Sequence, residues 1–221
     1  DSYVCNSPMF CENCNCGNSS CVDANGFIIG YNDINLMQRL IKAGSPNDKF
    51  MRQICVWVNI TAPLYWWKEA DQYRVGVTTD STSTMHKLSS TPITIDCFET
   101  DDYNPDLVYY EFDDDSGDTL NHIKYTVDGI VNKDDCMQEE TIINFLENLR
   151  QKYLETKDIK YWKELIRWLP ESWLQKRMTS MNYSVLRNQY FQRRNHKLTE
   201  WHTYCNWIES LPYAKELICL E

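Results

Sequence analysis

The sequence predicts an α+β fold in which one modest main sheet, contributed early in the chain, is covered by C-terminal helices. Two patterns predict it: side chains alternate in polarity along residues 50–61, and after Asp134 apolar residues recur at helical spacing. A chain of 221 residues of which 43% are hydrophobic can bury a sizeable core without disulfides. Residues 31–221 contain no internal repeat and no linker, so we expect them to form a single domain.

The first regular elements are a helix, a strand and a second helix. Asn32 and Asp33 are expected to cap a helix that Gly44 ends. The alternating residues 50–61 form the strand, with Ile54, Val56, Val58 and Ile60 on one side and Cys55, Trp57 and Asn59 on the other. Ala62-Pro63 ends the strand, and proline suits the first turn of a helix over residues 64–73.

The middle of the chain has weaker patterns, and its end is expected to be helical. Residues 75–86 predict a loop or an irregular strand, residues 99–119 an exposed acidic loop, and residues 122–127 a short strand. Apolar spacing then predicts four helices, over residues 142–154, 161–168, 173–194 and 198–211. The third of these is the long helix that carries Asn182 to Arg194.

Charge is unevenly distributed along a chain whose net charge is −10. The acidic loop 99–119 has no Lys or Arg, whereas residues 150–197 hold twelve Lys and Arg against four carboxylates. This distribution excludes a uniformly acidic nucleic-acid mimic, and the basic part could attract a phosphate. Solvated helix faces explain the same charges equally simply.

No apolar run approaches the roughly 18 residues that a membrane span needs, so no membrane association is expected. The chain begins at Asp1 and shows no secretory signal, which leaves a removed leader open. Five of the ten cysteines crowd the first 21 residues, and this uneven use favours a reducing compartment, the cytoplasm.

The crowded cysteines predict a metal site in a Cys-rich N-terminal loop over residues 1–30. Short spacings let several thiolates converge on one ion, zinc or an iron–sulfur cluster. One or two local disulfides, or free thiols, are the alternatives. The expected ligands are Cys11, Cys14, Cys16 and Cys21, with Cys5 nearby.

Two further segments carry side chains that could bind a ligand. The first combines a charged helix end with a Ser/Thr-rich turn, which offers hydroxyl and N–H donors of the kind that hold phosphate. Its candidates are Lys68, Glu69, Tyr73, Arg74, Asp80, Ser81, Ser83 and His86. The second is the predicted long helix, whose arginines suit phosphate or carboxylate, with candidates Asn182, Asn188, Arg193 and Arg194. An ordinary loop and a solvated helix face are the structural alternatives.

Together these segments resemble the flavin-dependent thymidylate synthases over residues 32–90 and 175–210. In that family an Ala-Pro closes a strand, and a helix leads to Arg-His-Arg-x2-Ser-x-Asn-Glu-x-Ser-x-Arg-Tyr. Aligned from Ala62-Pro63, Arg74 falls on the last Arg of Arg-His-Arg and Asp80 on the Glu. The family's C-terminal Asn-x-Arg-x3-Asn-x4-Arg and Gln-Trp-Glu are echoed by Asn182, Asn188, Arg193 or Arg194, and Glu200-Trp201.

The sequence departs from the family at most flavin-binding positions. Gln72-Tyr73 stands where the family has Arg-His, and Thr84-Met85 where it has Arg-Tyr. The family's reactive hydroxyl falls on Thr82, its upstream Gln on Glu69, and the middle Arg of its C-terminal pattern on Ser184. The positions remain polar, which indicates a retained fold with a changed ligand or reaction.

The resemblance implies a nucleotide-binding protein that could act on a pyrimidine nucleotide or related base with FAD or another cofactor. It also implies a homotetramer in which Arg193 and Arg194 of one subunit face the 68–86 segment of another. The arginines would hold a phosphate, Ser81 and Ser83 would add hydrogen bonds, and His86 or Asp80 could transfer a proton.

A second interpretation comes from a different class of protein. Chains of this type also resemble uncharacterised phage proteins, so the fold could serve a non-catalytic interaction or counter-defence protein in the host cytoplasm. Such a protein would sequester a nucleotide or block a host protein, and the acidic loop 99–119 could be the contact surface.

Overall fold

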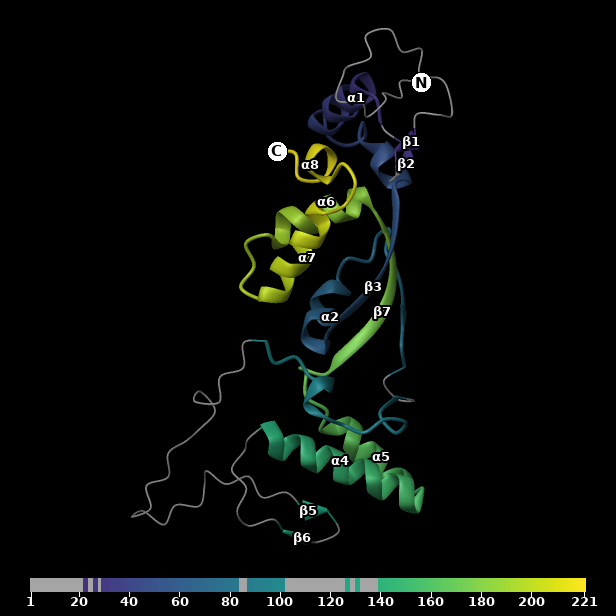
Figure 1. Ribbon diagram of the computed structural model, residues 1–221, viewed down its shortest axis with the longest axis vertical. Coiled ribbons are helices and arrows are strands. Elements are labelled where there is room, and N and C mark those ends of the chain that lie inside the picture. The colour runs from purple at the N-terminus through teal and green to yellow at the C-terminus, as the bar shows by residue number, and fades with distance from the viewer. Residues whose placement is uncertain are drawn as a thin grey trace, which may run out of the picture. The chain divides into compact units, whose positions relative to one another are not determined.

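The computed structural model describes residues 29–83, 87–101 and 139–221, together with four two-residue strands (Figure 1). These strands form two antiparallel pairs, β1 (Val22–Asp23) with β2 (Gly26–Phe27) and β5 (Thr126–Val127) with β6 (Ile130–Val131). β5 falls within the short strand predicted over residues 122–127. Most of the Cys-rich segment and of the acidic loop lies outside the described residues, so their predicted conformations stay predictions.

A three-stranded sheet has the order β3 (Cys55–Pro63), β7 (Leu174–Asn182), β4 (Thr78–Ser81). The described residues group into two compact units. The first holds those up to Val58, with Tyr73–Thr78 and Ser180–Glu221, and the second holds those within Asn59–Gln72 and Thr79–Thr179.

Strand β3 and the helix after it follow the prediction. Cys55, Trp57 and Asn59 are exposed, while the intervening residues are partly buried, as period-two alternation requires. Pro63 precedes α2 (Leu64–Ala70), which buries Trp66 and Trp67. Two first-turn N–H groups of α2 donate to the carbonyls of Trp173 and Glu171, at 3.1 and 3.2 Å, so this helix end is satisfied by backbone partners.

The predicted long helix over residues 173–194 is wrong in its first half. Residues 174–182 form strand β7, and helix α6 begins only at Tyr183 (Tyr183–Arg193). Gln175, Thr179 and Met181 are buried along β7, which lies between β3 and β4. Its Gln, Lys, Arg and Met residues have good helix propensity, but pairing on both sides in the sheet outweighs that local preference.

The first unit gathers the helices at the two ends of the described chain. Its elements are α1 (Tyr31–Lys42), the 3-10 helix η1 (Lys49–Gln53), α6, α7 (Thr199–Glu209) and α8 (Ala214–Leu217). Helix α6 packs against η1 and α7, and α1 packs against α8 (Figure 1). The N-cap of α1 is Gly30, so Asn32 and Asp33 lie in its first turn rather than capping it. Side chains that are essentially inaccessible fill this core: Met51, Leu186, Trp201, Ile208, Leu217 and Ile218.

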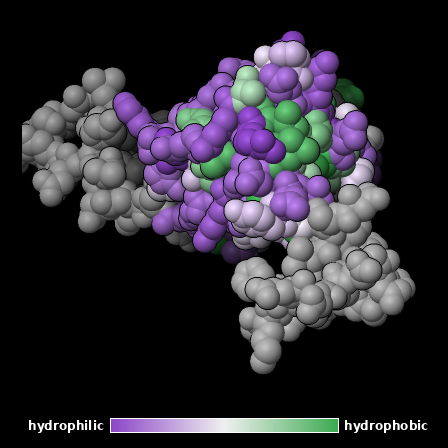
Figure 2. Space-filling view, turned by 90° about the horizontal axis from the view of Figure 1, so that it is seen from above, coloured by the Kyte–Doolittle hydropathy of each residue, from purple (hydrophilic) through white to green (hydrophobic). Residues whose placement is uncertain are grey.

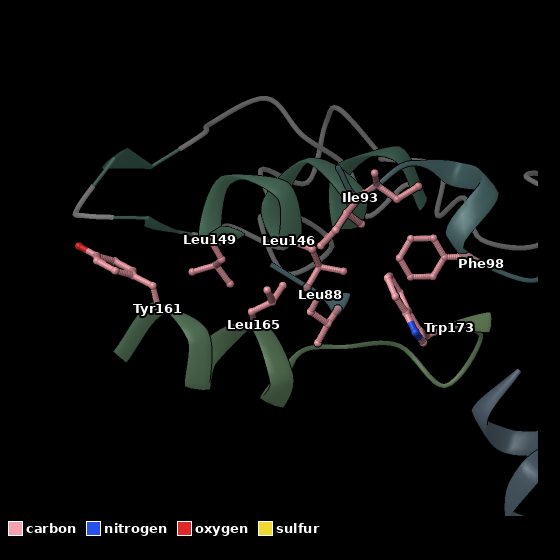
Figure 3. Packing of buried hydrophobic residues seen from close by; sticks show 9 residues of the cluster. Leu88, Ile93, Phe98, Leu146, Leu149, Tyr161, Leu165 and Trp173 are labelled. Carbon is pink, nitrogen blue, oxygen red and sulfur yellow. The ribbon is translucent and has the colours of Figure 1, made fainter. Parts of the chain in front are cut away.

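The second unit contains a helical hairpin of α4 (Glu139–Thr156) and α5 (Ile159–Arg167), as the sequence predicts within a few residues. Asp158 caps α5, because its carboxylate accepts from the N–H of Lys160 at 3.0 Å. Figure 3 shows Leu146 and Leu149 of α4 facing Leu165 of α5. Phe98 and Trp173 extend this core with an edge-to-face contact at 5.5 Å.

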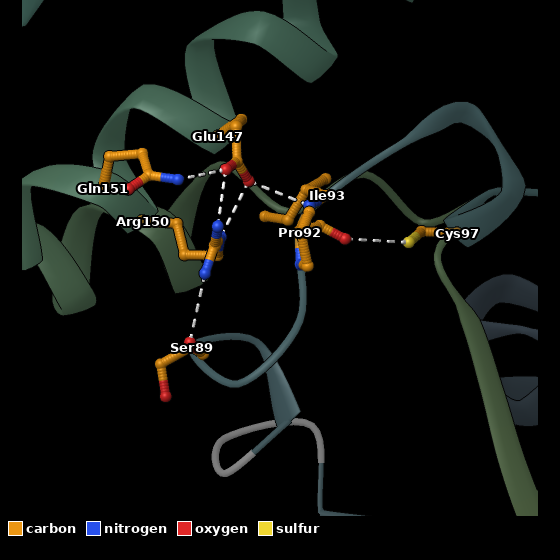
Figure 4. A network of polar contacts seen from close by, with 7 residues as sticks. All are labelled: Ser89, Pro92, Ile93, Cys97, Glu147, Arg150 and Gln151. Atoms are coloured by element: carbon orange, nitrogen blue, oxygen red, sulfur yellow. Dashed lines mark hydrogen bonds and ion pairs between the residues drawn. The ribbon is translucent and has the colours of Figure 1, made fainter. Parts of the chain in front are cut away.

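A buried ion pair ties an irregular segment to α4 (Figure 4). Arg150, only 5% exposed, donates to Glu147 through Nε at 2.7 Å and Nη2 at 2.6 Å, and through Nη1 to the carbonyl of Ser89. The Ile93 N–H also donates to Glu147, at 2.8 Å. Burial alone would raise the pKa of Glu147, but these hydrogen bonds outweigh it and hold that pKa below its usual value.

Among the described residues, no helix combines the length and the apolar character that crossing a membrane would require.

Candidate functional site

Tyr73 and Arg193, both predicted as ligand-binding residues, contact each other in the first unit. Tyr73 lies shortly after α2, and Arg193 is the last residue of α6. The Nε of Arg193 donates to the Tyr73 hydroxyl at 2.9 Å, and its guanidinium carbon lies 5.5 Å from the centre of the Tyr73 ring. Two segments 120 residues apart in sequence therefore meet at this pair.

A chain of hydrogen bonds leads from this pair to a third predicted residue, Asn188. The Tyr73 hydroxyl donates to Oε1 of Gln192 at 2.8 Å, and Nε2 of Gln192 donates to Oδ1 of Asn188 at 2.8 Å. Gln192 was not predicted, because a glutamine on an exposed helix face has no distinguishing pattern. Its spacing of four residues from Asn188 was the available indication.

Trp201 forms the apolar side of this group. It is fully buried, and the Arg193 guanidinium lies over its ring at 4.6 Å, within cation–π range. Tyr73 and His196 contact Trp201 edge-on, with ring centres 6.3 and 6.2 Å away. Because Trp201 is packed into the core, the aromatic surface under Arg193 is rigid.

The two adjacent arginines at the end of α6 face different partners. Nη1 of Arg194 pairs with Glu221 at 2.9 Å, and this hydrogen bond raises the pKa of Arg194. Earlier on the helix, Arg187 donates to the carbonyls of Ile218 and Leu220, and burial lowers its pKa. Arg193 thus faces the segment after α2, whereas Arg187 and Arg194 hold the C-terminal residues.

Asn182 has a structural role that its spacing did not reveal. Its Oδ1 accepts from the N–H of Val185 at 3.1 Å, so Asn182 is the N-cap of α6. The loop residue Gly76 packs against this cap with a left-handed φ of 76°, and a Cβ there would lie 3.1 Å from Nδ2 of Asn182. Arg74 of the same loop is exposed and makes no hydrogen bond or ion pair within the described chain.

The remaining predicted residues lie mainly in the second unit. Lys68 pairs with Glu171 at 2.5 Å on the surface, and Glu69 is partly buried. Asp80 and Ser81 lie exposed on β4, and the carbonyl of Ser83 accepts from the N–H of Lys87 at 3.1 Å. His86 lies outside the described residues. Its predicted part in proton transfer therefore stays a prediction.

Arg177 is a partly buried cation that the sequence did not single out. It lies over the Trp67 ring at 4.2 Å, and Nη1 bonds Asp71 at 2.7 Å, at the end of α2. Its Nε donates to Gln175 on the same face of β7. Had residues 174–182 been recognised as a strand, the spacing of two residues would have placed Gln175 and Arg177 on one face. The pair fixes the C-terminal end of α2.

The predicted metal ligands Cys11, Cys14, Cys16 and Cys21 lie outside the described residues. Within the described part of the chain, no cluster of three or more His, Cys, Asp or Glu residues could hold a metal ion. Cys55, Cys97, Cys205 and Cys219 are free thiols. Burial raises the pKa of Cys205 to about 11, so this thiol is protonated at neutral pH.

These elements define an α+β fold in which an arginine rests on a tryptophan between two segments distant in sequence. Solved structures of similar fold include those of the flavin-dependent thymidylate synthase ThyX from Helicobacter pylori. One complex with FAD and dUMP has a TM-score of 0.54 at 18% identity, covering 87% of this chain and 85% of that chain. A second, also with FAD and dUMP, has a TM-score of 0.53 at the same identity and coverage. No family model and no curated protein matches the sequence.

The comparison confirms the predicted fold class and its likeness to ThyX. At 18% identity it shows the fold alone.

Proposed function

We propose that this chain is a nucleotide-binding, thymidylate-synthase-like protein whose ligand is a pyrimidine nucleotide or a related base. The fold, which matches that of enzymes bound to dUMP and FAD, carries the proposal. Tyr73, Asn188 and Arg193, which the sequence predicts as ligand-binding residues, support it because hydrogen bonds link them. Arg193 would hold the phosphate, because a guanidinium makes charge-assisted hydrogen bonds to phosphate oxygens. Arg74, exposed on the same loop as Tyr73, would add a second cation.

The other predicted residues would join the nucleotide site from a second subunit. In a homotetramer, Lys68, Glu69, Ser81 and Ser83 of one subunit would face Arg193 and Arg194 of another, with Asp80 or His86 moving the proton. Native mass spectrometry tests this assembly. A tetramer is expected, and a monomer at micromolar concentration would contradict a site shared between subunits.

FAD fits this chain poorly as a cofactor. When bound, a flavin supplies reducing equivalents. The family that the chain resembles has Arg-His among its flavin-binding residues, and this chain has Gln72-Tyr73 at those positions. The Tyr73 hydroxyl is already used, accepting from Arg193 and donating to Gln192. We therefore assign Arg193 and Asn188 to the nucleotide and route no chemical step through a flavin.

The test is to identify what the purified protein carries and what stabilises it. Mass spectrometry of small molecules released on denaturation should find a pyrimidine nucleotide, or added dUMP should raise the melting temperature, since a ligand that binds only the folded state stabilises it. A yellow protein with flavin absorbance would show that a flavin binds despite these departures from the family. A colourless protein that neither carries nor responds to any nucleotide would refute the proposal.

The second candidate is the non-catalytic interaction protein, acting on a host protein. Large apolar side chains in the first unit favour it: Trp57 is 67% and Val75 90% exposed. Figure 2 shows apolar residues gathered within a largely polar face. A contiguous exposed apolar area is typical of contact surfaces, whereas single exposed side chains are common. A Trp57→Ser variant that loses a captured partner while nucleotide screening stays negative would support this function over the first.

A further inference from the structure

We infer that Tyr73 is a positioning residue that fixes the guanidinium of Arg193 in the geometry in which it binds an anion. The inference rests on the proposed nucleotide site and identifies the residue of this chain that orients its cation. It concerns a position where the sequence departs from the family it resembles, so it is a property of this chain's own residues.

The hydrogen-bonding capacities of the side chains fix the direction of each contact. The Nε–H of Arg193 can only donate, so the Tyr73 oxygen accepts from it at 2.9 Å. The Tyr73 hydroxyl therefore donates its single proton in a hydrogen bond to Oε1 of Gln192, at 2.8 Å. Gln192 in turn donates to Asn188 at 2.8 Å. The chain runs one way, from Arg193 through Tyr73 and Gln192 to Asn188, and such chains strengthen cooperatively.

The aromatic contacts restrict the same guanidinium from a second direction. Arg193 lies 4.6 Å from the Trp201 ring centre and 5.5 Å from that of Tyr73. Trp201 is fully buried and contacts Tyr73 edge-on, so the ring below the guanidinium cannot move independently. These ring contacts restrain the position of the guanidinium from one side. The hydrogen bond from Nε to Tyr73 adds a directional restraint, because it aligns the Nε–H, and with it the rigid guanidinium plane, toward the Tyr73 oxygen.

The loop that carries Tyr73 is itself held in place. Gly76 adopts a left-handed φ of 76° and lies against Asn182 and Val185 at the start of α6. Tyr73 and Gly76 therefore contact opposite ends of the same helix. Asn182 caps the helix start against which this loop packs.

Tyr73→Phe tests the inference, because it removes the hydroxyl and keeps the ring. Nucleotide affinity, measured with dUMP, should fall about tenfold, the factor that corresponds to about 1.4 kcal/mol. The matched control is Tyr31→Phe, since Tyr31 is 74% exposed and lies on α1 in the same unit. This variant should bind as tightly as the unsubstituted protein.

A second measurement does not depend on any ligand. In a ¹⁵N–¹H spectrum the Nε–H of Arg193 should exchange slowly with water, and Tyr73→Phe should accelerate that exchange at least tenfold. If the protein binds no nucleotide but the exchange behaves in this way, the positioning role stands and the proposed function fails. An Arg193 Nε–H that exchanges equally fast in Tyr73→Phe overturns the inference. So does weaker dUMP binding with unchanged exchange, because Tyr73 would then act on the ligand itself.

Discussion

Gly76→Ala should destabilise the protein by about 2–3 kcal/mol, because two separate penalties meet at this residue. Its φ of 76° is left-handed, which costs an alanine about 1 kcal/mol or more. The new Cβ would also lie 3.1 Å from both Nδ2 of Asn182 and Cγ2 of Val185. Moving the Asn182 amide weakens the N-cap of α6, worth about 1 kcal/mol.

Gly44→Ala provides a matched control, because Gly44 has nearly the same φ, 71°, and the methyl group of an alanine there would meet no atom of the described chain within 4 Å. Both substitutions share the backbone penalty and the same reduction of unfolded-state entropy. Their difference isolates the contact with Asn182 and Val185. Urea denaturation followed by tryptophan fluorescence measures each free energy of unfolding. Equal destabilisation by the two variants would refute the packing of this loop against α6.

The remaining predictions concern acid stability and the N-terminal cysteines. Because hydrogen bonds hold the pKa of Glu147 below its ordinary value of 4.5, its stabilising contribution is complete above pH 4.5 and is lost as pH falls through the lower folded-state pKa. The free energy of unfolding should be measured from pH 6 to pH 3 for the unsubstituted protein and for Glu147→Gln. It should fall more steeply with decreasing pH in the unsubstituted protein. Parallel curves of this free energy against pH would contradict the ion pair with Arg150. Elemental analysis of protein purified without chelators should find about one equivalent of zinc or of iron, lost in a variant with Cys11 and Cys14 replaced by serine; less than about half an equivalent would contradict the metal site.

The sequence predicted those elements whose burial follows a regular period. The strand at β3 and the hairpin of α4 and α5 bury one side at periods of two and 3.6 residues, so their polarity patterns are visible. Strand β7 has no such pattern, because its buried positions include Gln175 and Thr179. Its conformation depends on neighbouring strands that are distant in sequence, which local propensity cannot reveal.

The candidate site was predictable in part, for a similar reason. Alignment to a family pattern identified Asn188 and Arg193, and Tyr73 was a candidate as a polar residue at a position where the chain departs from that pattern. Neither argument identified Gln192, which links them, because a hydrogen-bond partner depends on three-dimensional proximity. The same alignment predicted a ligand-binding Asn182, and it did not reveal that this residue is also the N-cap of α6. An asparagine directly before a helix predicts a cap on physical grounds, provided that the helix start is known.

Isothermal titration with dUMP tests the central claim most directly, on the unsubstituted protein, Arg193→Ala and Arg39→Ala. Arg39 is an exposed arginine of α1, so its replacement changes net charge equally without touching the proposed site. An arginine–phosphate contact is worth on the order of 2–3 kcal/mol. We expect saturable dUMP binding that Arg193→Ala weakens about thirty-fold or more and Arg39→Ala leaves unchanged. Absence of binding to the unsubstituted protein, or equal affinity in Arg193→Ala, would contradict the proposed nucleotide site.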